Sequence, residues 1–354
     1  MSTEPSGVVV VGSINADLVV TLERHPQPGE TLLGRTMAVM PGGKGANQAV
    51  AAAKLGARTV MIGAVGQDTY TEVALSGLHD AGVDTGAVER VAGVSTGVAI
   101  VEVDDSGENT IVVIPGANAE VTPELVDASS QVIADAAVLV LQGEIPAGSV
   151  TAAAGVASGR VVINLAPVIV LDRSTLLRAD PLVVNEHEGA LVLAQLTGSA
   201  SGGALPSEAA DSTEPAVPSS QAAPSNHAVP SQHAATARAL VECGFASVVM
   251  TLGGSGALLA TASDLLEIPA PKVPVVDTTG AGDAFTGALA ARLSAGDSLP
   301  DAVRVAVLVG AYAVGTEGAQ PSYPSLEDPL PAAPGTTAHS LAGAQSSAEQ
   351  DTDA

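Results

Sequence analysis

One short segment combines a glycine turn with a carboxylate, and this combination could serve phosphoryl transfer. Asp277-Thr278-Thr279-Gly280-Ala281-Gly282-Asp283 follows the apolar run Val273–Val276 and precedes a helical pattern over Ala284–Leu293, so we predict a strand, a turn and a helix. Backbone N–H groups at a helix start bind anions, and glycines leave room for a phosphate to approach. Asp283 could accept a proton from an attacking hydroxyl. Alternatively, it only complements the helix dipole.

A second glycine-rich segment, Gly42-Gly43-Lys44-Gly45-Ala46-Asn47-Gln48-Ala49, also opens a predicted helix and carries one of only three lysines in the chain. It is not a Walker A loop, because that motif has four residues between its glycines and a Ser or Thr after the Lys. Lys44 and Asn47 could hold sugar hydroxyls or the transferring phosphate. The alternative is a loop with an incidental lysine.

Polar side chains follow two predicted strands at their carboxyl ends, where open parallel sheets bind ligands. Asn15 and Asp17 come after the first strand and could pair with vicinal hydroxyls, although an Asx-capped turn explains them equally well. Asn185 and Glu188 come after a later strand and could face a hydrated Mg²⁺. A helix cap with an acidic first turn is the alternative there.

A glycine-containing loop, Thr251-Leu252-Gly253-Gly254-Ser255-Gly256, follows another predicted strand. It resembles a dinucleotide-binding fingerprint, but its spacing is wrong. It also runs into the apolar Ala257–Ala260, a strand rather than the crossover helix that the fingerprint needs. We therefore interpret it as a hairpin loop that borders a nucleotide.

The elements that position these motifs alternate between short β-branched runs and helical patterns. Such runs are typical of a parallel sheet covered on both faces, and the alternation predicts a doubly wound, mostly parallel α/β fold flanked by helices. The predicted strands are Val8–Val11, Val60–Ile62, Ala137–Leu141, Val161–Ile163, Leu182–Val184 and Val248–Met250. The predicted helices are Ala46–Leu55, Tyr70–Ala81 and Thr122–Ile133, the last of which opens with a Thr-Pro-Glu cap.

Two regions interrupt this alternation, at about residues 17–39 and 97–114, and each reads as a pair of strands. The second pair surrounds Asp104-Asp105-Ser106-Gly107, a hairpin turn signal. We predict that both pairs form a small accessory β-sheet.

Two other stretches differ in composition from the rest. Ser199–Ala235 consists of Ala, Ser, Pro or Gly at 25 of 37 positions and has no Lys or Arg, so we expect a disordered insert. Residues 329–354 have a similar composition with added acid and are expected to form a disordered tail. The foldable chain is then one domain over residues 1–328.

Composition excludes several classes of protein. A formal net charge of -25 repels nucleic acid and anionic membrane surfaces, and five aromatic residues are too few for sites that stack bases. The single Cys243 excludes an internal disulfide or a cysteine-rich metal site. No apolar run is long enough to cross a membrane and no basic N-terminal signal is present, so a cytoplasmic enzyme is expected.

Taken together, the motifs resemble those of the ribokinase (PfkB-type) family of carbohydrate kinases. Gly42-Gly43 and Asp277–Asp283 correspond to the family's two hallmark segments, in the family's order. The resemblance extends from Val8 to about Leu326, apart from the insert, through Gly12–Asp17, Ser95–Ala99, Gly116–Ala119 and Gly318–Ser322. It implies ATP-dependent phosphorylation of the 5-hydroxyl of D-ribose, to give ribose 5-phosphate and ADP. The small sheet would then be a lid over the sugar and the contact of a homodimer.

The resemblance also implies a role for each matching residue. Asp283 would be the general base, with the backbone of Gly280, Ala281 and Gly282 as an anion hole. Ribose-contacting positions match Asn15, Asp17, Gly43, Lys44, Asn47, Glu144 and Asp283. Positions for ATP and its Mg²⁺ match Asn185, Glu188, Thr251, Gly253, Gly256 and Gly282. Positions for an activating K⁺ match Asp277, Thr279, Gly318 and Ser322, with Ala313 and Thr316 placed only by spacing.

Other functions stay open at this stage. Another sugar kinase or a nucleoside kinase of the family is the nearest alternative, although a nucleoside kinase would be expected to stack its base on aromatic rings. A sugar-sensing relative without turnover is an alternative from a different class. Asp283 argues against it, because a protein that only binds has no use for a base at the phosphoryl position.

Overall fold

The computed structural model describes residues 7–106, 109–198 and 231–334. Most of the predicted insert and of the predicted tail lies outside these residues. Two described parts correct the predicted limits. Helix α8 (Ser231–Glu242) begins inside the predicted insert, and Leu330, inside the predicted tail, is 2% exposed and belongs to the core. Ala237 and Leu240 of α8 are fully buried, so this helix has an apolar face that packs on the core. The small and polar residues before them gave no indication of that face.

A nine-stranded sheet forms the centre of the molecule, in the order β13-β12-β11-β10-β9-β8-β1-β4-β5. Its strands are β1 (Val8–Val11), β4 (Thr59–Val65), β5 (Asp84–Arg90), β8 (Val138–Gln142), β9 (Arg160–Asn164), β10 (Leu182–Asn185), β11 (Ser247–Thr251), β12 (Ala257–Thr261) and β13 (Leu265–Ile268). Every pair from β11 to β5 is parallel, and β12 is antiparallel to both its neighbours. The mostly parallel sheet and all six predicted strands are thereby confirmed. The winding reverses beside β1, where such sheets bind ligands.

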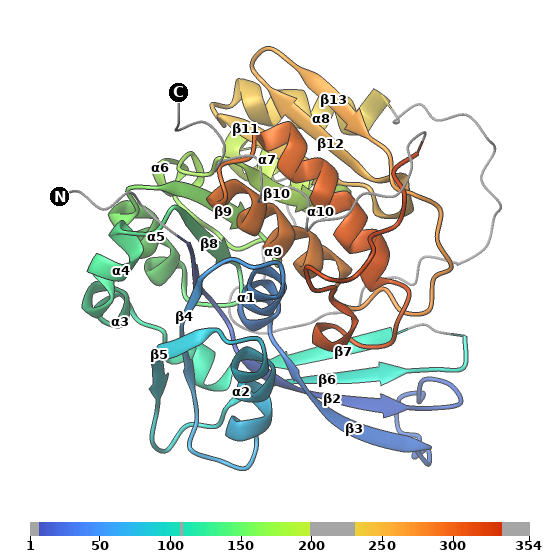
Figure 1. Ribbon diagram of the computed structural model, residues 1–354. Coiled ribbons are helices and arrows are strands. Elements are labelled where there is room, and N and C mark those ends of the chain that lie inside the picture. The colour runs from blue at the N-terminus through green and yellow to red at the C-terminus, as the bar shows by residue number, and fades with distance from the viewer. Residues whose placement is uncertain (1–6, 107–108, 199–230, 335–354) are drawn as a thin grey trace, which may run out of the picture.

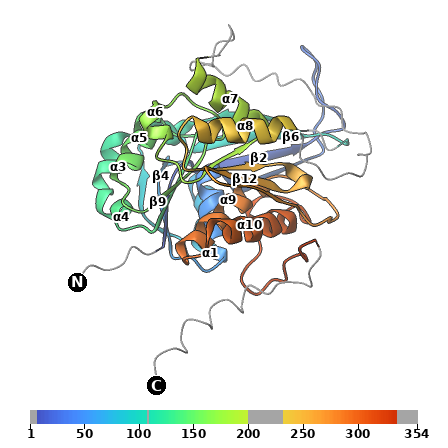
Figure 2. The ribbon, with the colours of Figure 1, turned by 90° about the horizontal axis from the view of Figure 1, so that it is seen from above.

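Helices cover both faces of this sheet (Figures 1 and 2). Val8 and Val10 of β1 belong to one apolar cluster and Val9 and Val11 to the other, because successive side chains on a strand point to opposite faces. The first cluster packs under α1 (Lys44–Lys54), α2 (Thr71–Asp80), α9 (Ala281–Ser294) and α10 (Leu299–Ala313). The second packs under α3 (Pro123–Ala128), α4 (Ser130–Ala134), α5 (Ala147–Val156), α6 (Arg173–Leu176), α7 (Glu186–Thr197) and α8.

Two predicted elements are wrong. The run Val273–Val276 forms no strand: Pro274 interrupts it and has no N–H for a strand ladder, and Val275 and Val276 are 64% and 58% exposed. The predicted helix Thr122–Ile133 is two short helices, α3 and α4, because Ser129 leaves helical geometry between them (φ -105°, ψ 10°). Its predicted start is confirmed, since the Thr122 hydroxyl caps α3.

A separate four-stranded sheet lies at the bottom of the view in Figure 1. It contains β2 (Asn15–Thr21), β3 (Thr36–Gly42), β6 (Gly97–Val103) and β7 (Asn109–Ile114), in the order β3-β2-β6-β7. The small accessory sheet is therefore confirmed, although the tip of the predicted β6–β7 turn lies outside the described residues. Only Gly12–Ile14 separate β1 from β2, so the chain passes directly from the large sheet into the small one.

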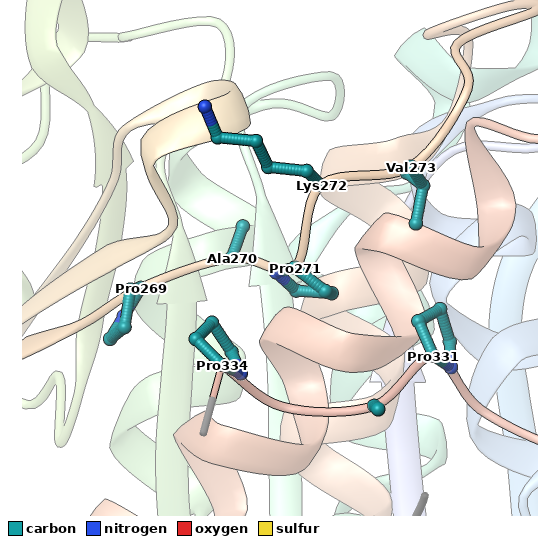
Figure 3. Close-up of a pocket in the computed structure, with 8 residues that line it drawn as sticks. Pro269, Ala270, Pro271, Lys272, Val273, Pro331 and Pro334 are labelled. Atoms are coloured by element: carbon teal, nitrogen blue, oxygen red, sulfur yellow. The ribbon is translucent and has the colours of Figure 1, made fainter. Parts of the chain in front are cut away.

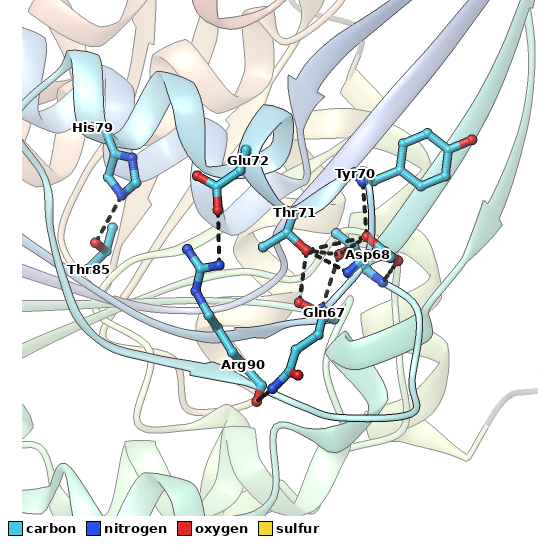
Figure 4. Close-up of polar contacts among 10 residues, drawn as sticks. Gln67, Asp68, Tyr70, Thr71, Glu72, His79, Thr85 and Arg90 are labelled. Carbon is cyan, nitrogen blue, oxygen red and sulfur yellow. Dashed lines mark hydrogen bonds and ion pairs between the residues drawn. The ribbon is translucent and has the colours of Figure 1, made fainter.

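A half-buried carboxylate, that of Asp68, connects the small sheet to the loop after β4. Asp68 accepts hydrogen bonds from the Thr96 N–H (2.7 Å) and hydroxyl (2.9 Å), directly before β6, and from the Tyr70 N–H (3.0 Å). Figure 4 shows this carboxylate surrounded by Tyr70 and Thr71. Burial by itself raises the pKa of Asp68, but these hydrogen bonds lower it overall. The ionised Asp68 carboxylate therefore links the loop after β4 of the large sheet to the segment before β6 of the small sheet.

No helix in the described part of the chain is long and apolar enough to cross a bilayer.

Candidate active site

A cavity of about 240 Å³ opens between the start of α9 and the carboxyl ends of the neighbouring parallel strands. It brings together predicted residues from four separate segments: Lys44, Asn185, Glu188, Thr251, Gly280, Gly282 and Asp283. It also includes residues that we did not predict, namely Asn164, Ala166, Val183, Thr278 and Thr286. The polar ends of several strands therefore converge on Asp283.

The start of α9 is built to receive an anion. Its N-cap, Gly280, has a left-handed backbone (φ 72°) and supplies no capping side chain, so N–H groups of the first turn are left for a ligand. A Cβ at this position would lie 2.5 Å from the Tyr323 hydroxyl, which donates a hydrogen bond to the Gly280 carbonyl (3.1 Å). Ala281 donates its N–H to the Thr278 carbonyl (3.2 Å), which closes the turn. Only glycine satisfies both the backbone angle and the close approach.

Asp283 lies on the first turn of α9 and is 6% exposed. Its Oδ1 accepts a hydrogen bond from Gln48 Nε2 (2.9 Å), and its Oδ2 accepts one from Asn47 Nδ2 (3.0 Å). Lys44 is the first residue of α1, the helix that also carries Asn47 and Gln48. Its pKa is raised, chiefly through its attraction to Asp283. The Asp283 carboxylate, which can accept a proton, and the positively charged Lys44 side chain therefore line the same cavity.

The predicted sugar residues gather beside this cavity. The Glu144 Oε2 accepts hydrogen bonds from the Ser13 hydroxyl (2.5 Å) and the Lys44 N–H (3.1 Å), directly after Gly43, the N-cap of α1. Asn15 is buried on β2, and its Oδ1 accepts a hydrogen bond from Asn118 (2.7 Å), which leaves its N–H donors for other partners.

The carboxyl of Asp17 has a strongly raised pKa. Burial, which is the largest cause, and the negative charges of Glu144 and Asp283 together raise this pKa to about 7, although Lys44 opposes the shift. Its Oδ1 is buried without a hydrogen-bond partner among the described residues. An acceptor in this state is suited to the hydroxyl groups of a ligand.

Asn185 and Glu188 form a capping box at the start of α7. The Asn185 side chain accepts from the Glu188 N–H (2.8 Å), and the Glu188 carboxylate accepts from the Asn185 N–H (2.8 Å). The capping alternative is therefore real, yet both residues also line the cavity. Burial raises the pKa of Glu188, and its carboxylate is a suitable oxygen donor for a hydrated divalent cation.

The predicted nucleotide loop connects β11 to β12, in the antiparallel hairpin that the sequence indicated. Thr251 lines the cavity, whereas Gly253 and Gly256 lie beyond its rim, on and after a short 3₁₀ turn (Gly253–Ser255). Of the three predicted loop residues, Thr251 alone lines the cavity.

Two of the predicted cation residues, Thr279 and Gly318, contact the carboxylate of a third, Asp277. Asp277 accepts hydrogen bonds from the Thr279 N–H (2.8 Å) and hydroxyl (2.7 Å), and from the Gly318 N–H (2.8 Å). Burial by itself raises the pKa of Asp277, but these bonds lower it overall. Thr316 donates weakly to the Ala313 carbonyl (3.4 Å), while Ser322 is buried and donates to the Ala319 carbonyl. The contacts therefore bring together Asp277, Thr279 and Gly318, while those of Thr316 and Ser322 are local.

Sequence reasoning missed the amide side chains around Asp283. Asn164 ends β9 and could have been found by the rule that identified Asn185, because both end a parallel strand. Gln48 follows Asn47 directly in a segment that we did single out. Gln320 lies within Gly318–Ser322, a segment that carries the family resemblance, but its partner Asn47 is 273 residues away in the chain. Gln142 had no local signal, since its partner Gln48 is 94 residues away.

A larger cavity, of about 460 Å³, lies elsewhere, where the segment after β13 runs beside residues 331–334 (Figure 3). Prolines dominate its lining, and the Lys272 side chain points away from the others. It contains no carboxylate, hydroxyl or side-chain amide, so we assign the chemistry to the smaller cavity.

The whole described fold is similar to that of known carbohydrate kinases. Residues 6–326 match a family model described as pfkB family carbohydrate kinase. The chain is 36% identical to the ribokinase of Schizosaccharomyces pombe over 330 residues, which cover 90% of this chain and 95% of that protein. It is 35% identical to a deoxyribokinase of Salmonella typhi over 324 residues, with coverages of 90% and 96%. A structure of Arabidopsis thaliana ribokinase complexed with ribose and ATP superposes with a TM-score of 0.75 at 31% identity, over 90% of this chain and 96% of that one.

Proposed function

The chain belongs to the pfkB family of carbohydrate kinases, and from this premise we propose that it transfers the γ-phosphoryl group of ATP to the 5-hydroxyl of D-ribose. The family resemblance, the kinase activity class and the fold with a small-sheet lid are confirmed. The sugar, the roles of individual residues and the cytoplasmic location are proposals.

The position of Asp283 carries the proposal. Its carboxylate lies in the cavity, on the first turn of a helix whose free N–H groups attract a phosphoryl group. Asp283 accepts the proton of the sugar hydroxyl as that oxygen attacks the γ-phosphorus. The bond from the γ-phosphorus to the oxygen that bridges it to the β-phosphorus breaks, and ADP leaves. The Gly280–Gly282 turn and Lys44 stabilise the charge that spreads over the phosphoryl oxygens.

The sugar is held from two sides. Asn15 and Asp17 extend from the lid, and Gly43, Lys44, Asn47 and Glu144 come from the body of the molecule. The unpartnered Asp17 oxygen and the free Asn15 N–H groups support hydrogen bonds to vicinal hydroxyls.

Asn185, Glu188, Thr251, Gly253, Gly256 and Gly282 would hold ATP and its Mg²⁺. When bound, Mg²⁺ neutralises phosphate charge during the transfer. Glu188 supports this assignment, because its carboxylate shares the cavity with Asp283. Asp277, Thr279, Ala313, Thr316, Gly318 and Ser322 would hold K⁺, which the bonds from Asp277 to both Thr279 and Gly318 support.

Deoxyribose is the second candidate substrate, because the deoxyribokinase matches as well as the ribokinases do. The test is ADP release in a coupled assay with ribose, deoxyribose, fructose and adenosine, each against a blank without acceptor. We expect the highest kcat/KM with ribose. A higher value with deoxyribose would transfer the assignment to that sugar. Tight ribose binding without ADP release would instead indicate a sugar sensor.

We also propose that the lid pairs two copies of the chain. Residues Ile111–Ile114 of the edge strand β7 are all apolar and between 41% and 48% exposed, although a strand with one buried face would alternate. Val113 pairs with Ala99, which pairs with Asp17, so Val113 and Asp17 lie on the same face of the small sheet. Val112 pairs with Ile100 and lies on the opposite face. Val112→Lys should therefore convert a dimer to a monomer in sedimentation velocity. A monomeric wild-type chain would overturn the proposal.

A further inference from the structure

A buried amide, Gln48, holds the carboxylate that the proposed function uses as its base. Gln48 is 0% exposed and does not line the cavity. Its Nε2 donates to Asp283 Oδ1 (2.9 Å) and to Asn164 Oδ1 (2.9 Å), and its Oε1 accepts from Gln142 Nε2 (2.8 Å). All three contacts come from elements other than its own helix α1.

These contacts permit only one orientation of the amide. A primary amide has two N–H donors on one side and a carbonyl acceptor on the other. Rotating the Gln48 amide by 180° would place its oxygen against two acceptor oxygens, on Asp283 and Asn164. It would also place its NH₂ group against the NH₂ group of Gln142. The network therefore fixes which group faces Asp283.

A second arm reaches the other oxygen of the same carboxylate. Gln320 Nε2 donates to Asn47 Oδ1 (2.9 Å), which leaves Asn47 Nδ2 to donate to Asp283 Oδ2 (3.0 Å). Lys54 anchors this arm by donating to the carbonyl of Gln320 (2.8 Å). Each Asp283 oxygen is thus held by a donor whose orientation another side chain fixes.

We propose that Gln48 is a positioning residue for Asp283, which fixes the rotamer of the base. The proposal rests on the proposed function, since a base must exist to be positioned. The hydrogen bond from Gln48 holds Asp283 Oδ1 in one place, as the bond from Asn47 holds Oδ2. Gln48 does not touch the cavity, so its loss should affect the transfer step and leave substrate binding nearly unchanged.

Other groups also act on Asp283, and the experiment has to keep them constant. Lys44, Asp17, Glu188 and Tyr323 each interact electrostatically with it. None of these side chains makes a hydrogen bond to Gln48 among the contacts described here, so a change confined to Gln48 leaves their charges in place.

The test compares Gln48→Met, which preserves length and volume but removes all three contacts, with the wild type. We expect kcat to fall on the order of 10- to 10²-fold, with the KM for ribose and for ATP changed by less than about threefold. This split between kcat and KM separates lost positioning from a general loss of structure, which would weaken substrate binding as well. Gln195→Met is the matched control, because among the described residues Gln195 donates to the Leu171 carbonyl (2.7 Å), away from the cavity. It should leave kcat and both KM values unchanged.

A second variant keeps the proposal falsifiable if Gln48→Met does not fold. Gln142→Met leaves Gln48 in contact with Asp283 but removes the donor that fixes its amide, so a smaller fall in kcat, again with little change in KM, is expected. A wild-type kcat in whichever of the two variants folds would overturn the positioning role. A wild-type chain that phosphorylates no sugar in the panel would instead overturn the proposed function, and the inference with it.

Discussion

Gly287 of α9 faces the backbone of Gln48 on α1 so closely that a Cβ on Gly287 would lie 2.5 Å from the Gln48 carbonyl oxygen. The same Cβ would lie 2.5 Å from the Cβ of Ala51. Gly287 is one helical turn beyond Asp283, so the tight crossing sets the distance between Asp283, the proposed base, and the α1 side chains that donate to it. The geometry around Asp283 thus depends on the absence of a side chain at Gly287, a residue that does not line the cavity.

Gly287→Ala should therefore push α9 away from α1. We expect destabilisation by about 1–3 kcal/mol, as for other overpacked cores, and a loss of kcat larger than the loss of folded protein explains. Thermal unfolding and kcat per folded molecule measure the two effects. Gly155→Ala on α5 is the control: nothing lies within 4 Å of the added Cβ, so stability should stay equal or rise by about 0.5–1 kcal/mol.

Asp283→Asn should abolish catalysis while keeping the fold and ligand binding. The amide cannot accept the hydroxyl proton, so kcat should fall on the order of 10²-fold or more. Calorimetric titration should still show binding of ribose and ATP. Near-normal turnover in this variant would remove Asp283 from the role of base.

Ribose affinity should rise with pH between about 6 and 8. The pKa of Asp17 is raised to about 7, and sugar hydroxyls donate to the ionised carboxylate, so binding is favoured once that carboxyl loses its proton. Titration of ribose at pH 6, 7 and 8 measures the trend, and Asp17→Asn should bind weakly and without it. A pH-independent affinity in the wild type would contradict the assignment of Asp17 to the sugar.

The same pKa predicts a cost in stability. A carboxyl whose folded pKa lies above its unfolded value near 4 stabilises the fold below that value, and the contribution is lost as pH rises towards 7. Asp17→Asn should therefore raise the Tm more at pH 8 than at pH 5. An equal Tm change at both pH values would show that burial does not penalise the charge.

Turnover should depend on K⁺ more than on Na⁺. A cation held near Asp277, behind the Gly280–Gly282 turn, would fix the direction of the turn's N–H groups, and an oxygen cage suits a large, weakly hydrated ion. Rates in KCl, NaCl and choline chloride at fixed ionic strength test this, and Asp277→Ala should flatten the differences. KCl should also raise the Tm of the ligand-free wild type above that in choline chloride. Equal rates in all three salts would remove the cation site and leave the kinase assignment standing.

The strands of the large sheet were predicted well, because the signal for each strand lies within its own short run of residues. Short, continuous β-branched runs such as Val8–Val11 are buried on both faces, and each lies where the pattern indicated. Val273–Val276 has the same apolar composition but contains a proline and packs on neither face, so the rule failed there. The prediction of disorder for residues 231–235 was wrong in the opposite sense. Their small side chains suggested disorder, but these residues form the start of α8.

The site was predicted only in part for a related reason. Residues at strand ends and helix starts, such as Glu188 and Asp283, carry a positional signal that the sequence displays. The contact of Gln48 with Gln142 depends instead on how α1 packs over β8, and no local pattern encodes it.

The two halves of the proposed sugar site belong to different parts of the fold, with Asn15 and Asp17 on β2 of the lid and Lys44 and Asn47 on α1 over the large sheet. A ligand that contacts both halves would hold the lid at one position relative to the large sheet. Any free energy needed to bring the lid to that position would reduce the measured affinity. A molecule with the right hydroxyls but too short to contact both halves would bind to one of them alone.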